Sequence, residues 1–222
     1  MTKAVTSPPE WRRRAGLAVS VPSAQFPGGL TTDLGRSAAE GWAALDREDA
    51  DAAAAAAARC RRLAWEQPDD APGVLLGWEG DHPAEPLARA HAEGQPYGEI
   101  GAAVAFLARC FEEGGDVEDL DAAVELHDLV VALGEGVWEP GNALVGWGGA
   151  LLYEITGEDA FLATAERMAD VLAETQGPDG SWGDGDDVLT GVAVAALVAM
   201  ADAVEARAAV EEALPDAVEE GD

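Results

Sequence analysis

The sequence predicts an all-α domain in which a helix–loop–helix unit repeats around a common centre, as an (α/α) toroid or partial toroid of helix pairs. Two observations predict it. Apolar residues recur near helical spacing and are interrupted by glycine-centred breaks, and the same order of segments returns with a period of roughly 43 to 45 residues. One helix of each pair is rich in Gly and Ala, which lets helices pack closely, so we expect a ring rather than a straight solenoid.

The clearest unit runs from residue 142 to residue 182. Residues 142–153 are apolar with small residues on several sides, as in a helix that is buried all round. Gly and Asp residues then supply a helix stop and a helix cap, and residues 159–176 follow with charges between regularly spaced apolar residues. The unit is therefore an inner helix, an amphipathic outer helix and a turn-rich loop that ends in Trp182.

The same order of segments is found elsewhere in the chain. Further inner helices are expected at residues 37–45, 97–111 and 187–204, and further outer helices at residues 49–67 and 117–133. This gives three full pairs and part of a fourth, with a longer loop from Gln67 to near Trp78. We expect the helical-repeat domain to span residues 36–207, after an irregular segment, 1–35, and before an acidic tail, 208–222.

The charge of the chain excludes two classes of partner. The formal net charge is −30, from 43 acidic and 13 basic residues, and such a surface repels nucleic-acid phosphates and anionic lipid head groups. Screening by salt makes this self-repulsion tolerable, so a halophilic host is one hypothesis, and a GC-rich genome is the alternative. No apolar run approaches the roughly 20 residues of a membrane span, and Pro22 follows the short apolar stretch after Arg12–Arg14 too soon for a typical signal peptide.

The cysteines and histidines give no sign of a metal or a redox site. Cys60 and Cys110 lie in helical patterns without metal-ligand spacing, so we interpret them as buried thiols of a cytoplasmic protein. His127 lies on an amphipathic helix and is interpreted as a surface or boundary residue. No phosphate-binding loop or nucleophile motif is present in the sequence, and we expect neither a cofactor nor a metal.

The loop that closes the clearest unit carries a family resemblance. Its residues Gln-Gly-Pro-Asp-Gly-Ser-Trp, 176–182, resemble the Gln/Trp repeat of the squalene-cyclase-like superfamily of α/α toroids. Asp184-Gly-Asp186-Asp187 then matches the spacing of the Asp-x-Asp-Asp motif of class II terpene cyclases. The resemblance implies that Asp186 donates a proton to a double bond or epoxide, with Asp184 and Asp187 adjusting its acidity.

Such chemistry sets physical requirements. A carboxyl group stays protonated when close like charges share a dry cavity, and the cation that forms needs aromatic walls. Tyr97 and Trp147 lie on inner helices and are candidates for that wall, and Trp182 is a further candidate for substrate contact. The alternative is that the acidic residues form a solvated loop that caps the next helix.

The Gly/Ala-rich inner helices also resemble those of the (α/α) barrels of unsaturated-glucuronyl hydrolases, sugar epimerases and lanthionine cyclases. In those folds the site lies at the N-termini of the inner helices, where Glu99, Asn142, Asp187 and Asp33 stand in this chain. Paired carboxylates such as Glu99 and Asp187 could serve general acid and base chemistry on a sugar. The alternative is that each residue only caps its helix.

Three hypotheses of function follow. The first is a cyclase or isomerase of terpene-cyclase-like type that acts on an isoprenoid or other apolar small molecule. The second is a glycan-processing enzyme, and the third is a non-catalytic helical-repeat binding module. A filled centre among the inner helices favours the binding module. The toroid families close with roughly five to seven pairs, so we expect the domain to be open or completed by another copy as a homo-oligomer.

Overall fold

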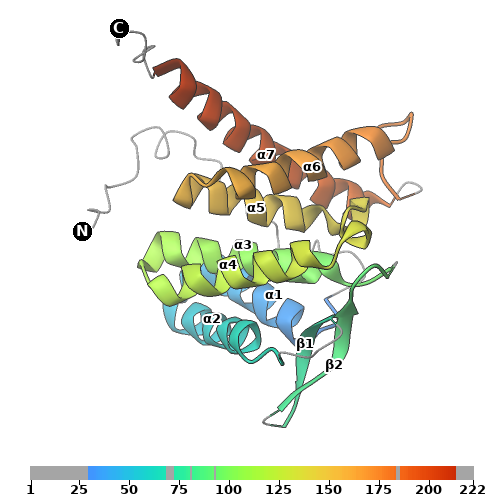
Figure 1. The fold of residues 1–222 in the computed structure, drawn as a ribbon. Coiled ribbons are helices and arrows are strands. Elements are labelled where there is room, and N and C mark those ends of the chain that lie inside the picture. Colours follow the sequence, from blue (N-terminus) through green and yellow to red (C-terminus); the bar gives the residue numbers. More distant parts are fainter. Residues whose placement is uncertain (1–29, 69–72, 81, 93, 184–185, 214–222) are drawn as a thin grey trace, which may run out of the picture.

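The computed structural model describes residues 30–68, 73–80, 82–92, 94–183 and 186–213 (Figure 1). This part of the chain is mostly helical, as predicted. Because the described residues begin at 30, the predicted irregular segment 1–35 lies almost entirely outside them. The predicted acidic tail begins as helix, because the last helix continues to Ala213.

Pairs of helices make up most of the described chain. The inner helices are α1 (Asp33–Asp46), α3 (Tyr97–Gly114), α5 (Ala143–Thr156) and α7 (Asp187–Ala213). The outer helices are α2 (Ala50–Trp65), α4 (Val117–Ala132) and α6 (Asp159–Thr175), and the short 3-10 turns η2 (Glu135–Val137) and η3 (Pro140–Asn142) lie between α4 and α5. The described residues thus contain the three full pairs and the further inner helix that the sequence predicts.

The helices form two layers. Each outer helix packs against the inner helix before it in the chain, and successive inner helices pack side by side, α1 on α3, α3 on α5 and α5 on α7 (Figure 1). Gly115 and Gly157 end α3 and α5 in the left-handed conformation, with φ of 74° and 72°, because glycine adopts this conformation without strain. The glycine stops read from the sequence are therefore confirmed.

A small antiparallel sheet departs from the all-α expectation. Strands β1 (Gly73–Glu79) and β2 (His82–Arg89) form a hairpin with an irregularity between Leu75 and Gly77, in a segment where the sequence predicted part of a loop. Val74 and Leu76 are buried, so the strand covers the end of α1 and α2. The amide of Gln67 extends the sheet, because it donates to Leu75 O and accepts from Leu75 N. A short apolar run bounded by Gly and Pro is typical of a strand, but the helical repeat on either side of it favoured a loop at these residues.

The core is built from small and apolar residues of the inner helices. Every residue of α3 from Tyr97 to Ala108 is buried, and the small Gly and Ala residues there let α1 and α5 approach closely. Cys60 and Cys110 are buried free thiols, as predicted, and burial raises the pKa of the Cys60 thiol above its usual range and that of Cys110 to about 12.

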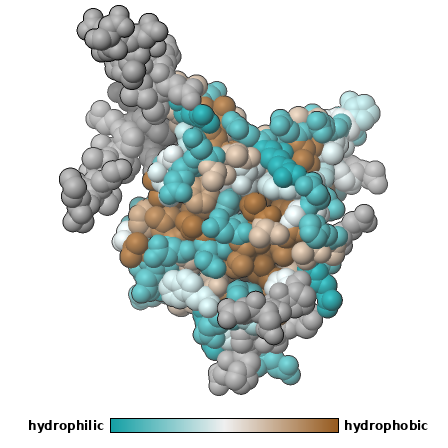
Figure 2. Space-filling model, in the orientation of Figure 1, coloured by the Kyte–Doolittle hydropathy of each residue, from teal (hydrophilic) through white to brown (hydrophobic). Residues whose placement is uncertain are grey.

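The surface is mixed in polarity. Figure 2 shows hydrophobic and hydrophilic residues interspersed over the face seen in Figure 1. One described helix, α7 over Asp187–Ala209, is long and apolar enough by length and composition to cross a membrane, and a third of that stretch is buried. The sequence did not predict a membrane span at α7, because Asp187 and Asp202 interrupt its apolar run.

Candidate functional site

Glu99 lies in the first turn of α3, but its side chain accepts hydrogen bonds at the start of the neighbouring inner helix, α1. Its side chain is buried, with 8% exposed, and its carboxylate accepts four hydrogen bonds from the residues that begin α1. Oε1 accepts from the backbone and side chain of Thr31, at 2.9 Å each, and Oε2 from those of Thr32, at 3.0 and 2.5 Å. Gly35 leaves room for this carboxylate, because a Cβ there would lie 2.1 Å from Oε2.

Asn142 has the same role one repeat later. Its Oδ1 accepts from Gly98 N at 3.0 Å, at the start of α3, and its Nδ2 donates to Val137 O at 3.1 Å. The alternative interpretation, that each residue caps its own helix, is therefore wrong for Glu99 and Asn142, because each accepts hydrogen bonds at the start of the preceding inner helix. Their polar groups are engaged within the protein and are not directed toward a shared cavity.

The described part of the acidic motif, Asp186 and Asp187, lies at the surface. Asp184 is outside the described residues, and Asp187 is exposed at the first position of α7. Asp186 is exposed too, and its Oδ1 accepts from Val188 N at 2.9 Å and Leu189 N at 3.0 Å. These are the contacts of a helix N-cap, which satisfies backbone N–H groups that have no partner in the first turn.

The predicted aromatic residues are part of the core. Trp147 is buried and stacks on Trp42 of α1, with ring centroids 5.3 Å apart and planes at 16°. The ring centroid of Phe106 of α3 lies 6.2 Å from that of Trp42, so aromatic rings from three inner helices pack against one another in the core. The indole of the buried Trp182 donates to Leu172 O at 2.8 Å and anchors its loop to α6.

Tyr97 is also structural. Its hydroxyl donates toward Arg89 O at 2.5 Å or Ala92 O at 2.9 Å, and so ties the end of the hairpin to α3. Burial raises the pKa of the Tyr97 phenol, because the charged form loses contact with water. The five inner-helix candidates Tyr97, Glu99, Asn142, Trp147 and Asp187 are thus not brought together, and four of them stabilise the fold.

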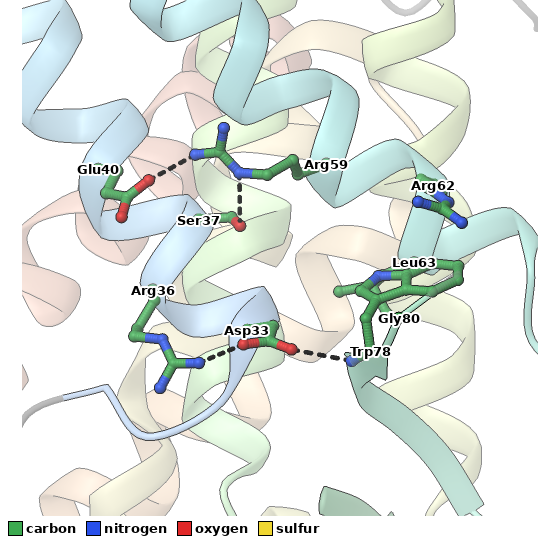
Figure 3. A pocket seen from close by; sticks show the side chains of 9 residues that line it. All are labelled: Asp33, Arg36, Ser37, Glu40, Arg59, Arg62, Leu63, Trp78 and Gly80. Carbon is green, nitrogen blue, oxygen red and sulfur yellow. Dashed lines mark hydrogen bonds and ion pairs between the residues drawn. The ribbon is translucent and has the colours of Figure 1, made fainter. Parts of the chain in front are cut away.

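Asp33 is a predicted site residue that lines a pocket of the described part of the chain. The pocket has a volume of about 320 Å³ and lies between α1, α2 and the end of β1 (Figure 3). Asp33 forms an ion pair with Arg36 and accepts from Trp78 N at 2.8 Å. Its lining consists of Asp33, Arg36, Ser37, Glu40, Arg59, Arg62, Leu63, Trp78 and Gly80.

Three arginines give this pocket its character. Arg59 reaches from α2 to α1, where Nε donates to Ser37 Oγ at 3.1 Å and the guanidinium pairs with Glu40 at 2.5 Å. The guanidinium of Arg62 lies over the Trp78 ring (Figure 3), at 3.7 Å from the ring centre. With Arg36, the lining holds three guanidinium groups and two carboxylates, and each guanidinium has a carboxylate partner, because Arg62 also pairs with Glu66 at 3.2 Å.

Arg36, Arg59, Arg62 and Trp78 are not among the site residues predicted from the sequence. A usable signal was present, because Arg59, Arg61 and Arg62 are clustered in a chain with only 13 basic residues. Arg61 faces the other way and pairs with Asp116 and Asp119 of the second repeat, at 3.0 and 2.5 Å. Successive residues of a helix point in different directions, so the sequence predicts that Arg61 lies on another face than Arg59 and Arg62. Which residues each face contacts depends on the tertiary structure.

His127 was wrongly interpreted as a surface or boundary residue. It is buried, with Nε2 3.1 Å from Thr164 Oγ1 and its ring edge-to-face with Phe161 at 4.8 Å. Burial lowers the pKa of the imidazole below its ordinary value of 6.5, and the contact with Asp128 offsets this only in part. Among the residues that the structure describes, no group of three or more His, Cys, Asp or Glu side chains is placed to hold a metal ion.

This burial predicts a pH dependence of stability. The folded state disfavours protonation of His127, so the stabilisation is complete above the unfolded pKa of about 6.5 and declines as the pH falls below it. We expect the free energy of unfolding of the wild type, relative to that of His127→Gln, to decrease from about pH 7.5 to about pH 5. Urea titrations at constant salt measure the difference, and a pH-independent difference would contradict the prediction.

Comparison with known proteins gives no relative for this chain: no family model, no curated protein and no solved structure matches it.

Proposed function

We propose that this chain is a non-catalytic helical-repeat binding module, built as a partial toroid, whose pocket between α1, α2 and β1 binds a small organic anion. The observation that carries the proposal is the arginine-rich lining of that pocket in a strongly acidic chain. Between the inner helices, where a toroid enzyme would hold its substrate, lie the buried rings of Trp42, Phe106 and Trp147. The pocket at the edge of the α1–α2 pair is therefore the better candidate for ligand binding.

The chemistry of the pocket fits an anion. A guanidinium group carries five N–H donors, and Arg36 uses two of its own in the contacts to Thr31 O and Asp33. N–H groups therefore remain for a carboxylate or phosphate, which arginine binds with charge-assisted hydrogen bonds. The stacked pair of Arg62 and Trp78 adds a flat wall against which a ring can pack. These arginines are three of the 13 basic residues of a chain with 43 acidic ones, so the pocket is a place where cationic groups gather on an otherwise acidic protein.

The test compares probes that differ in charge. Benzoate and inorganic phosphate supply the two kinds of oxyanion, and benzamide is a neutral molecule with the shape of benzoate. We expect an anion to bind with a Kd that rises with salt, and benzamide to bind at least about 10-fold more weakly, as the loss of a charge-assisted hydrogen bond implies. Isothermal titration calorimetry measures both, and the stronger of benzoate and phosphate identifies the kind of oxyanion.

A matched pair of variants places the binding in the pocket. Arg62→Gln removes a guanidinium that stacks on Trp78, and Arg167→Gln removes one that stacks on Trp138 and pairs with Glu135 outside the pocket. Arg62→Gln is expected to weaken anion binding about 10-fold, and Arg167→Gln to leave it unchanged. Equal effects of the two variants, or no binding of either anion by the wild type, would refute the proposal.

A glycan-processing role is the second candidate, because Asp33, Glu40 and the half-buried Trp78 line the same pocket. Carboxylates and an indole ring suit the hydroxyl groups and the apolar face of a sugar. Release of nitrophenol from 4-nitrophenyl glycosides, lost in Glu40→Gln, would support it. The acid-initiated cyclase is not favoured by the geometry, since that chemistry needs a carboxyl group removed from water and Asp186 is exposed.

A further inference from the structure

One face of α1 brings opposite charges together in the pocket between α1, α2 and β1. Asp33, Arg36, Ser37 and Glu40 follow one another at helical spacing, so their side chains lie in one row along the helix. Figure 3 shows the Asp33–Arg36 pair at one end of this row, and Glu40 with Arg59 of α2 at the other. The lining therefore offers a ligand positive and negative groups side by side.

The two carboxylates of the lining differ in how fully the protein itself engages them. Asp33 Oδ1 pairs with Arg36, and its Oδ2 accepts from Trp78 N at 2.8 Å, so both oxygens have a partner. Glu40 Oε2 pairs with Arg59 at 2.5 Å, but within the described ranges no residue binds Oε1. The side chain of Glu40 is also 67% exposed. Glu40 is therefore the carboxylate of this lining that keeps an acceptor oxygen for a ligand.

Arg59 keeps hydrogen-bond donors beside that oxygen. Its Nε donates to Ser37 Oγ at 3.1 Å, one terminal nitrogen donates to Ala55 O at 3.3 Å, and the other pairs with Glu40. A guanidinium group carries five N–H donors, so two of those of Arg59 have no partner among the residues that the structure describes. Free donors and a free acceptor thus lie next to each other, on the two members of one ion pair.

A ligand that complements this ion pair carries both signs of charge on neighbouring groups. The carboxylate of an α-amino acid accepts hydrogen bonds from guanidinium N–H groups, and its ammonium group, on the same carbon, donates to a carboxylate oxygen. The charge of the whole chain favours the same class, because a net charge of −30 repels an anion at long range but does not repel a zwitterion. The stack of Arg62 on Trp78 adds a flat wall for an aromatic side chain.

We infer, on the basis of the proposed function, that the pocket binds an aromatic amino acid, whose carboxylate pairs with Arg59 and whose ammonium group pairs with Glu40. The carboxylate is the anionic group already assigned to this pocket, and the ammonium group is the new element. Glu40 is then the residue that selects an amino acid over a plain carboxylic acid. The pocket volume of about 320 Å³ lies at the lower end of the roughly 300–1,000 Å³ of ligand pockets, so it suits a single amino acid.

Three ligands that differ at one carbon atom provide the test. L-Phenylalanine carries an ammonium group at that carbon, 3-phenyllactate carries a hydroxyl group, and 3-phenylpropanoate carries only hydrogen. Isothermal titration calorimetry of the full chain at about pH 7, where an amino group is protonated, measures the three Kd values. We expect L-phenylalanine to bind at least about 10-fold more tightly than 3-phenylpropanoate, because it adds a charge-assisted hydrogen bond to Glu40, and 3-phenyllactate to bind with an intermediate Kd.

A matched pair of variants assigns the preference to Glu40. Glu40→Gln keeps the length of the side chain and removes its charge, and the fold tolerates this because an exposed ion pair contributes little to stability. We expect Glu40→Gln to weaken binding of L-phenylalanine about 10-fold without weakening that of 3-phenylpropanoate, so that the ratio of the two Kd values falls to about 1. Glu125→Gln makes the same change at an exposed position of α4 and should keep the wild-type ratio.

The outcomes separate this inference from the proposed function. If benzoate or 3-phenylpropanoate binds but L-phenylalanine binds no more tightly, or if Glu40→Gln keeps the wild-type ratio, the pocket holds an anion and the amino-acid inference is wrong. If 3-phenyllactate binds as tightly as L-phenylalanine, the ligand class is a hydroxy acid instead. If none of these ligands and no phosphate binds to the wild type, the proposed function fails as well.

Discussion

Replacement of Glu99 by Leu is expected to lower the free energy of unfolding by about 4 kcal/mol. The carboxylate accepts two backbone N–H and two hydroxyl hydrogen bonds from Thr31 and Thr32, and Leu would leave the backbone donors without a partner in a largely buried site. Each unsatisfied buried donor costs roughly 1–3 kcal/mol, and the hydroxyls lose charge-assisted bonds. Urea denaturation followed by circular dichroism measures the change.

Two variants separate capping from the change in charge. Glu125→Leu removes a carboxylate from an exposed position of α4, and we expect it to change the free energy of unfolding by less than about 0.5 kcal/mol. Glu99→Gln keeps one acceptor oxygen but turns an amide N–H₂ toward the threonine donors, so its effect should lie between those of the other two. A Glu99→Leu variant as stable as Glu125→Leu would show that α1 does not depend on this carboxylate.

The role of Glu99 links the repeats to one another. Because Glu99 caps α1 and Asn142 caps α3, each inner helix is fixed to the next at its N-terminal end. Asp187 is the corresponding residue of α7, and it is exposed. Among the described residues, no hydrogen bond joins its side chain to the start of α5, so the regular link between inner helices is not repeated at α7.

The order and type of the helices could be predicted because they depend on local signals. Apolar spacing defined the inner and outer helices, and the glycines at 115 and 157 ended α3 and α5 as expected. The hairpin at residues 73–89 was missed, because its apolar run is short and its partner for one edge is the side chain of Gln67. Such pairing depends on where α2 ends and leaves no periodic pattern in the sequence.

The candidate site was harder to predict because its residues come from three elements. Asp33 was identified from its place at the start of α1, but Arg59 and Arg62 belong to α2 and Trp78 to β1. Trp147 was predicted to line a cavity because it is aromatic and lies on an inner helix. Its stacking on Trp42 depends on how closely α1, α3 and α5 approach one another, and this spacing is set by small residues.

Gly101→Ala is the second change with a large expected effect, and it tests this spacing directly. A Cβ at Gly101 of α3 would lie 2.4 Å from Val145 N and 2.5 Å from Leu144 C, which are backbone atoms of α5. Backbone cannot move aside as a flexible side chain can, so the two helices must separate. We expect the free energy of unfolding to fall by about 3 kcal/mol, even though Ala favours a helix over Gly by about 1 kcal/mol.

The same substitution at Gly191 is the matched control, because that position is also helical but a Cβ there meets nothing within 4 Å. Gly191→Ala should therefore raise the free energy of unfolding by up to about 1 kcal/mol, through helix propensity alone. Urea denaturation of both variants gives opposite signs if α3 and α5 are in backbone contact. An increase in stability from both would mean that α3 and α5 stand further apart than the backbone contact at Gly101 implies.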